Sequence, residues 1–186
     1  LLLLMLTVSK KLPTSDQNTL SLVMITNRTR ECLFLPQFNT MTPNKKLVSV
    51  KNGGRSQAYA DILTKIQEDA VCPFCPEYLE KYHKPPIVKR GKHWLITPNM
   101  YPYENTSFHF LFITTRHITD SEELTREEWL ELQELNQWII SEYGIDCGTL
   151  IMRSGDMSKT GATVMHLHAQ FVVGSDPEKP VMTRVG

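Results

Sequence analysis

Polar and apolar residues alternate in the stretch Val164-Met-His166-Leu-His168-Ala-Gln170-Phe171. On a β-strand the polar side chains of residues 166, 168 and 170 would share one face, about 6.6 Å apart, and the apolar ones would face the other way. The apolar face has an obvious packing role. Two imidazoles and an amide in a row are costly beside a core unless each has a partner. The stretch therefore indicates either a strand that carries chemistry or a solvent-facing strand with two incidental histidines.

The sequence around this stretch predicts an α+β domain. Apolar residues at helical spacing predict one helix over 56–69 and a longer one over 125–143, where Thr125-Arg-Glu-Glu128 is typical of a capping box. Short apolar runs predict strands at 86–88, 94–97, 108–114, 148–153 and 164–173. The links are of hairpin length, which favours an antiparallel sheet of about five strands with the two main helices packed on it.

Charge divides the 186-residue chain into two parts. Residues 1–55 hold eight Lys/Arg and two Asp/Glu, a net +6, whereas residues 56–186 hold twelve and eighteen, a net −6. Residues 1–55 also show no sustained period, so we predict a basic, largely irregular arm before a domain at 56–186. The whole chain has no net charge, so we do not expect a nucleic-acid partner.

The chain begins with an apolar run, Leu1–Val8, followed by Lys10 and Lys11. Eight residues are too few to span a bilayer, and the charges follow the run where a signal peptide would have them precede it. We expect a cytoplasmic protein with no membrane association.

Two of the four cysteines form the turn Cys72-Pro-Phe-Cys75. This spacing suits a metal site or a redox pair better than a disulfide framework. Zinc needs four ligands, typically a mixture of Cys and His, and the chain has six histidines. The other two cysteines show no partner, and Cys147 is expected to be buried as a small hydrophobic residue.

The combined motifs resemble those of the histidine-triad (HIT) superfamily. Gly161-Ala-Thr-Val-Met-His166-Leu-His168-Ala-Gln170 is similar to its signature, with Gln in place of the third His. That variant resembles the branch of galactose-1-phosphate uridylyltransferase and the diadenosine tetraphosphate phosphorylases. Two further segments, 94–103 and 110–118, resemble the nucleotide-site segment and the strand that ends in Arg-His. The resemblance covers about residues 56–175 and implies a HIT-like sheet.

The resemblance implies an enzyme, a nucleotidyl transferase or hydrolase that acts at the α-phosphate of a dinucleoside polyphosphate or nucleotide sugar. His168 would attack the phosphorus and carry the nucleotidyl group, since neutral imidazole is a competent nucleophile near pH 7. Gln170 would donate to a phosphate oxygen. Because glutamine does not titrate, it cannot protonate a leaving group, which favours transfer or phosphorolysis over hydrolysis.

The resemblance also implies the residues that bind the substrate. Asn99, Tyr101 and Tyr103 would line the base and ribose pocket, although ordinary loop packing also explains the two tyrosines. Gly161 and Thr163 would bind the phosphate through N–H groups and a hydroxyl. Arg153 would pair with a phosphate or lie on the surface.

By the same resemblance, structural zinc would be held by Cys72, Cys75, His117 and His166. A closed site of four protein ligands keeps no open position for chemistry. The competing interpretation is a free cysteine pair with unrelated histidines. Of the remaining histidines, His109 is expected in the core or an interface, and His83 and His93 on the surface.

Two other functions stay open at this level. One is a nucleotide-binding module with little turnover, because Ala162 and Gln170 both weaken the hydrolase version of the site. The other is a nucleic-acid end-processing enzyme that grips phosphates with the basic arm. Members of the family commonly pair as homodimers, and Trp129 and Trp138 are candidate interface residues, though core packing explains them equally well.

Overall fold

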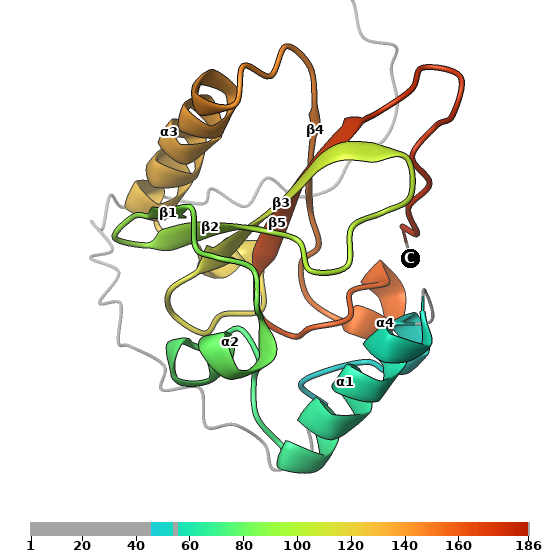
Figure 1. The fold of residues 1–186 in the computed structure, drawn as a ribbon. Coiled ribbons are helices and arrows are strands. Elements are labelled where there is room, and N and C mark those ends of the chain that lie inside the picture. The colour runs from blue at the N-terminus through green and yellow to red at the C-terminus, as the bar shows by residue number, and fades with distance from the viewer. Residues whose placement is uncertain (1–45, 54–55, 186) are drawn as a thin grey trace, which may run out of the picture. The chain divides into compact units, whose positions relative to one another are not determined.

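The computed structural model describes residues 46–53 and 56–185 of the chain (Figure 1). The predictions for residues 1–45 lie outside the described residues. The helices are α1 (Gln57–Asp69), α2 (Pro76–Tyr82), α3 (Arg126–Glu142) and α4 (Met157–Thr160), with short 3-10 turns η1 (Lys51–Gly53) and η2 (Ser121–Glu123). The strands are β1 (Lys89–Arg90), β2 (Trp94–Pro98), β3 (Thr106–Thr114), β4 (Thr149–Met152) and β5 (His168–Gly174). No helix among these has the length and apolar character needed to cross a membrane.

The five strands form one antiparallel sheet in the order β1-β2-β3-β5-β4. This confirms the predicted α+β fold with a five-stranded antiparallel sheet. The register assigns side chains to the two faces, because residues directly opposite each other point the same way. Phe112 opposes Ala169, whereas Leu111 opposes Gln170 and Ile113 opposes His168. The two polar residues of β5 therefore lie on the opposite face from Phe112 and Ala169.

Helix α3 covers the face that carries Phe112. Its buried residues Leu132, Leu135 and Ile139 pack with aromatic and aliphatic side chains of β2, β3 and β5 in the largest apolar cluster. Thr125 caps the helix by accepting from the Glu128 N–H, and the Glu128 carboxylate accepts from the Thr125 N–H in return. The long helix was thus correctly predicted, to within one residue at each end.

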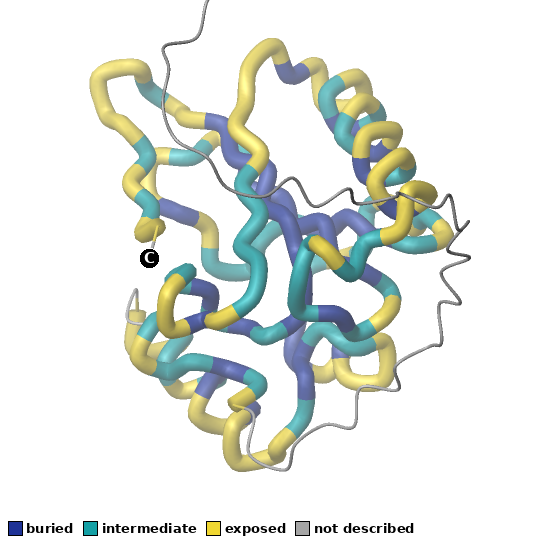
Figure 2. The backbone as a smooth tube through the Cα atoms, turned by 180° about the vertical axis from the view of Figure 1, so that it is seen from behind, coloured by how far each residue is buried: buried dark blue, intermediate teal, exposed yellow. Residues whose placement is uncertain are grey.

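The other helices gather on the opposite side of the sheet, where Figure 1 shows α1, α2 and α4 away from α3. Leu79 of α2 packs on Leu95, Leu111 and Ile113, and a further small cluster joins α1 to Val48 and Val164. The central strands are the most buried part of the backbone (Figure 2). This side of the sheet carries two small apolar clusters and leaves room for a site.

The segment before β5 differs from the prediction. The strand begins at His168, not at Val164, because the preceding residues bond to other partners: the Met165 N–H donates to the Leu47 carbonyl and the Leu167 N–H to the Ile118 carbonyl. Val48 forms an isolated bridge with Val164 and is buried. Residues 46–53, which were assigned to the arm, therefore pack as part of the domain.

The ion pair between Arg116 and Glu128 ties the end of β3 to α3. The Glu128 side chain is only 2% exposed, and Arg116 donates to both of its oxygens at 2.6 and 2.8 Å. Arg116 therefore lowers the pKa of Glu128 from 4.5 to about 2. A carboxyl whose pKa is depressed in the folded state stabilises the fold above its unfolded pKa, and this stability is lost as the pH falls toward the folded value.

We accordingly expect Glu128→Gln to remove a pH-dependent part of the stability. Between about pH 5 and pH 3, the wild-type protein should lose about 2 kcal/mol more unfolding free energy than the variant. Urea unfolding at both pH values measures this difference, and comparison of the two proteins cancels the titration of shared groups. Glu127→Gln, an exposed neighbour on the same helix, is the matched control and should behave like wild type. Equal pH dependence in Glu128→Gln and wild type would contradict the assignment.

Candidate active site and metal centre

His168 begins β5 and is 6% exposed. Its Nδ1 lies 2.7 Å from the carbonyl oxygen of His166, and since a carbonyl only accepts, Nδ1 carries the proton. The other ring nitrogen, Nε2, then has a lone pair, and no described residue hydrogen-bonds to it. Burial lowers the pKa of His168 to about 4, and the positive charge of Arg153 acts in the same direction. The ring is therefore neutral near pH 7 and oriented as a nucleophile would be.

Gln170 follows on the same face of β5, and His109 of β3 fixes its orientation. The Tyr103 backbone N–H donates to His109 Nδ1 at 3.0 Å, which leaves the ring proton on Nε2. Nε2 lies 3.0 Å both from the side-chain oxygen of Gln170 and from Asn99 Nδ2, and of these two atoms only the Gln170 oxygen can accept its proton. The amide oxygen of Gln170 is thus engaged with His109, and its NH₂ group is left to donate elsewhere. His109 is buried in the core, in line with its prediction.

Two cysteines and two histidines meet beside this strand. The ligand atoms of Cys72, Cys75, His117 and His166 all lie within 4.8 Å of one another. The separations include 3.4 Å from Cys72 Sγ to His166 Nδ1 and 3.3 Å from Cys75 Sγ to His117 Nδ1. Zinc bonds of about 2.0–2.3 Å in a tetrahedron put ligand atoms roughly 3.3–3.8 Å apart. The two sulfur–nitrogen separations therefore match those between zinc ligands.

The surroundings of the cluster also fit a metal. The Nε2 proton of His166 points at the Thr114 carbonyl oxygen, 2.8 Å away, which leaves the Nδ1 lone pair facing the two sulfurs. Such an outer hydrogen bond fixes the ring of a ligating histidine. His117 directly follows Arg116, whose ion pair with Glu128 anchors that end of β3. Two thiolates would balance the charge of one Zn²⁺.

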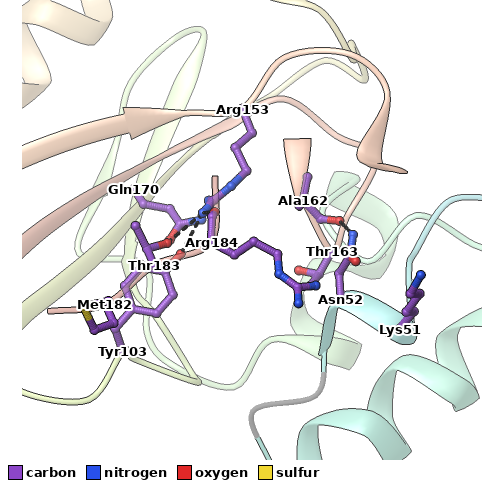
Figure 3. Close-up of a pocket in the computed structure, with 11 residues that line it drawn as sticks. Lys51, Asn52, Tyr103, Arg153, Ala162, Thr163, Gln170, Met182, Thr183 and Arg184 are labelled. Carbon is purple, nitrogen blue, oxygen red and sulfur yellow. Dashed lines mark hydrogen bonds between the residues drawn. The ribbon is translucent and has the colours of Figure 1, made fainter. Parts of the chain in front are cut away.

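A cationic pocket of about 290 Å³ opens on the same side (Figure 3). Eleven residues line it: Lys51, Asn52, Tyr103, Arg153, Gly161, Ala162, Thr163, Gln170, Met182, Thr183 and Arg184. Three of them are basic and none carries a carboxylate. The pocket thus joins the predicted phosphate-binding residues to two segments, 51–52 and 182–184, that no motif indicated.

A second, smaller pocket of about 50 Å³ has aromatic and aliphatic walls. Asn99 and Tyr101 line it together with Tyr59 and Phe74. The predicted nucleoside-binding residues are therefore separated, because Tyr103 lines the cationic pocket instead. The rings of Tyr59 and Tyr101, both in the wall of this pocket, pack with centroids 4.4 Å apart.

One direct contact joins the two pockets, and His168, which lines neither of them, neighbours a wall residue of each. The Tyr59 hydroxyl of the apolar pocket lies 2.7 Å from Thr163 Oγ1 of the cationic pocket. Phe74 of the apolar pocket contacts the His168 ring edge-to-face, with centroids 5.2 Å apart. Gln170 of the cationic pocket follows His168 by two residues on one strand face.

Two single-residue predictions were wrong. His83 is buried, not on the surface: its Nε2 lies 2.8 Å from Thr97 Oγ1, and burial lowers its pKa. Cys147 is exposed, because it lies in the turn between α3 and β4 where nothing covers it. Lys51 and Arg184 were missed, since single basic residues in irregular segments give no signal in a sequence.

The solved structures similar to this chain include several HIT proteins. A histidine triad nucleotide-binding protein from Candida albicans matches with a TM-score of 0.50 at 12% identity, over 62% of this chain and 85% of that one. A HIT family hydrolase from Clostridium thermocellum matches at 0.48, with 20% identity over 60% and 96%. A zinc-bound histidine triad family protein from Mycobacterium smegmatis matches at 0.47, with 20% identity over 63% and 84%.

The likeness to the Candida structure shows that the chain has a HIT-like fold, and at this identity it shows the fold alone. No protein-family model and no curated protein sequence matches the chain. The branch with Gln at the third position of the triad stays a prediction.

Proposed function

We propose that this protein is a nucleotidyl transferase or hydrolase that works through a nucleotidyl group bound to His168. The observation that carries the proposal is the fixed tautomer of His168, a buried neutral imidazole whose Nε2 accepts no hydrogen bond from a described residue and whose strand neighbour Gln170 lines the cationic pocket. The HIT-like fold and the nucleotide-binding name of the Candida protein support it.

The proposed reaction has two steps. In the first, the His168 Nε2 lone pair attacks the α-phosphorus, an N–P bond forms, and the bond to the leaving oxygen breaks with its electron pair going to the leaving group. The ring becomes positively charged, and its Nδ1 proton, held by the His166 carbonyl, stabilises that charge. In the second, water or a phosphate acceptor attacks the phosphorus and returns the electron pair to Nε2, and the acceptor's proton passes to solvent.

Gln170 and the loop at 161–163 would hold the non-bridging phosphate oxygens. Since His109 engages the oxygen of the Gln170 amide, the NH₂ group can donate to an oxyanion. Gln170 has no proton to give to a leaving group. This favours a leaving group that departs as a stable anion, and transfer or phosphorolysis over simple hydrolysis.

The apolar pocket would take the base, with the Asn99 side chain toward the ribose. Its aromatic walls suit a stacked base, but about 50 Å³ is too narrow for a ligand of drug-like size, which needs roughly 300 Å³ or more. Separation of the Tyr59 and Tyr101 rings, which pack against each other at a tilt, would widen it. The nucleoside side of the site therefore opens only with movement of one of these rings.

The Cys72, Cys75, His117 and His166 cluster would hold structural zinc. When bound, the metal supplies a rigid cross-link with no open position for chemistry. His166 would then be fixed as a ligand, and its carbonyl oxygen would in turn orient the His168 ring. The metal and the nucleophile are thus coupled through one residue.

Intact-protein mass spectrometry tests the proposal. Brief incubation with diadenosine tetraphosphate or UDP-glucose, followed by a quench at alkaline pH where a phosphoramidate survives, should show an added AMP or UMP. Peptide mapping should place this mass on His168. Tight binding of the nucleotide with no adduct and no product over hours would refute the covalent mechanism and favour the binding module.

A homodimer and a cytoplasmic location stay predictions. Of the two candidate tryptophans, Trp129 is 47% exposed on α3, with Leu130 beside it also exposed. Trp138 instead packs against the core under the Lys89 ammonium group. A second copy of the chain would therefore cover Trp129 rather than Trp138.

A further inference from the structure

The cationic pocket holds more positive charge than one phosphate requires. Lys51, Arg153 and Arg184 come from η1, the end of β4 and the carboxyl-terminal tail, three segments that are far apart in the sequence. None of the three forms an ion pair within the described part of the chain. Three cations gathered without a carboxylate repel one another, so the site is complementary to an anion of several charges.

Arg153 is held in place for such a ligand. Its Nη2 donates to Thr183 Oγ1 and to the Arg184 carbonyl, both at 2.8 Å, and lies 3.3 Å from the Tyr103 hydroxyl. Its Nε is buried and has no hydrogen-bond partner among the described residues. A guanidinium has five N–H donors, so Arg153 ties down the tail and still has donors for an oxyanion.

The tail and η1 bring the other two charges to the pocket. A Cβ placed on Gly161 would lie 3.2 Å from Arg184 Cγ, so the Arg184 stem packs directly on the predicted phosphate loop. Figure 3 shows its side chain extending toward Thr163 and Asn52. Asn52 donates to the Ala162 and Met157 carbonyls at 2.8 and 3.1 Å, which fixes η1 and its Lys51 against the same loop.

We propose that Lys51, Arg153 and Arg184 form a subsite for a polyphosphate chain of two or more phosphate groups, carried by the leaving group of the nucleotide. The inference rests on the proposed function for its place beside the α-phosphate. Gln170 and the 161–163 loop account for that first phosphate, and the three cations then match the charge of the phosphates beyond it. At about 290 Å³, the pocket has room for more than one phosphate group.

Binding of inorganic tripolyphosphate, measured by isothermal titration calorimetry on the full chain, tests the subsite without any catalysis. Tripolyphosphate should bind at least tenfold more tightly than orthophosphate. Arg184→Gln and Lys51→Gln should each weaken tripolyphosphate about tenfold, and Arg184→Lys should retain most of the affinity. Lys159→Gln, an exposed cation of α4 outside the pocket, is the matched control and should bind like wild type. Equal affinity for the two anions, or no effect of the pocket variants, would overturn the proposal.

A second binding experiment tests whether the subsite holds the phosphates of the leaving group or those of an incoming acceptor. The non-cleavable analogue α,β-methylene ATP should compete with tripolyphosphate and bind more tightly than AMP, and Arg184→Gln should remove this advantage. Simultaneous binding of the analogue and tripolyphosphate would place a free acceptor in the subsite and overturn the assignment to the leaving group. Tighter binding after deletion of residues 181–186 would identify the tail as a plug and also overturn it. Neither binding experiment depends on a reaction at His168. Failure of the covalent mechanism would therefore not affect the conclusion about the subsite.

Discussion

Replacement of His168 by glutamine is expected to lower kcat by at least about 10³-fold and to eliminate the covalent adduct. The imidazole supplies the attacking electron pair, and its Nε2 accepts no hydrogen bond from any described residue. His168 is only 6% exposed, and glutamine preserves much of the volume of its ring, so the variant should fold. Steady-state kinetics with the substrate that forms the adduct, together with intact mass, measures both effects.

Two controls separate the nucleophile from its neighbours. Gln170→Ala should slow the reaction by roughly 10²–10³-fold, because it removes a donor to the transition state, yet the adduct should still form. His93→Ala, which lies outside both pockets, should leave kcat unchanged. Circular dichroism and the melting temperature report that each variant is folded. Wild-type turnover in His168→Gln would rule out the covalent mechanism.

The sequence predicts the fold well where the pattern depends on local packing. Helix α3 has a capping box at Thr125 and Glu128 and a periodic apolar stripe, and both are found as predicted. The alternation after His168 likewise predicts β5 and its two faces. The capping box, the helical periodicity and the strand alternation all involve residues close together in the chain, so they can be read from the sequence.

The segment just before β5 could not be predicted in the same way. Its alternation from Val164 to Leu167 suggests a continuous strand, but its N–H groups bond to Leu47 and Ile118. Those partners lie in segments without periodicity. The consequence is functional, because the break at residue 167 lets His166 turn into the Cys–His cluster while His168 stays on the sheet.

Site residues that belong to sequence motifs could be predicted, and those outside motifs could not. Cysteine spacing alone indicated two metal ligands, and the family resemblance was needed to choose His117 and His166 among six histidines. The role of His109 was not foreseen, since its effect on Gln170 depends on a backbone N–H from Tyr103. The cationic pocket forms only because residues 182–184 fold back against it, and a single arginine at position 184 does not predict that path.

The purified protein is expected to contain one zinc ion per chain, and its removal should lower the melting temperature by tens of degrees or unfold the domain. The four ligands join the start of α2, the loop after β3 and the segment before β5, while only small apolar clusters support that side of the sheet. Structural zinc contributes about 10 kcal/mol or more, comparable with the whole stability of a domain. Elemental analysis gives the stoichiometry, and thermal unfolding with and without a strong chelator gives the effect.

Matched cysteine variants decide between zinc and a free thiol pair. Cys75→Ser should lose the metal and the stability together, because serine replaces a thiolate that faces both histidines. Cys147→Ser alters an exposed thiol outside the cluster and should change neither. A free or redox-active cysteine pair would instead show no bound metal and a melting temperature that does not change with chelator. On mild oxidation, Cys72 and Cys75 would then form a disulfide, seen as a loss of two hydrogens in the intact mass. Since His166 orients His168 through its carbonyl oxygen, we expect the chelated protein to lose the nucleotidyl adduct as well.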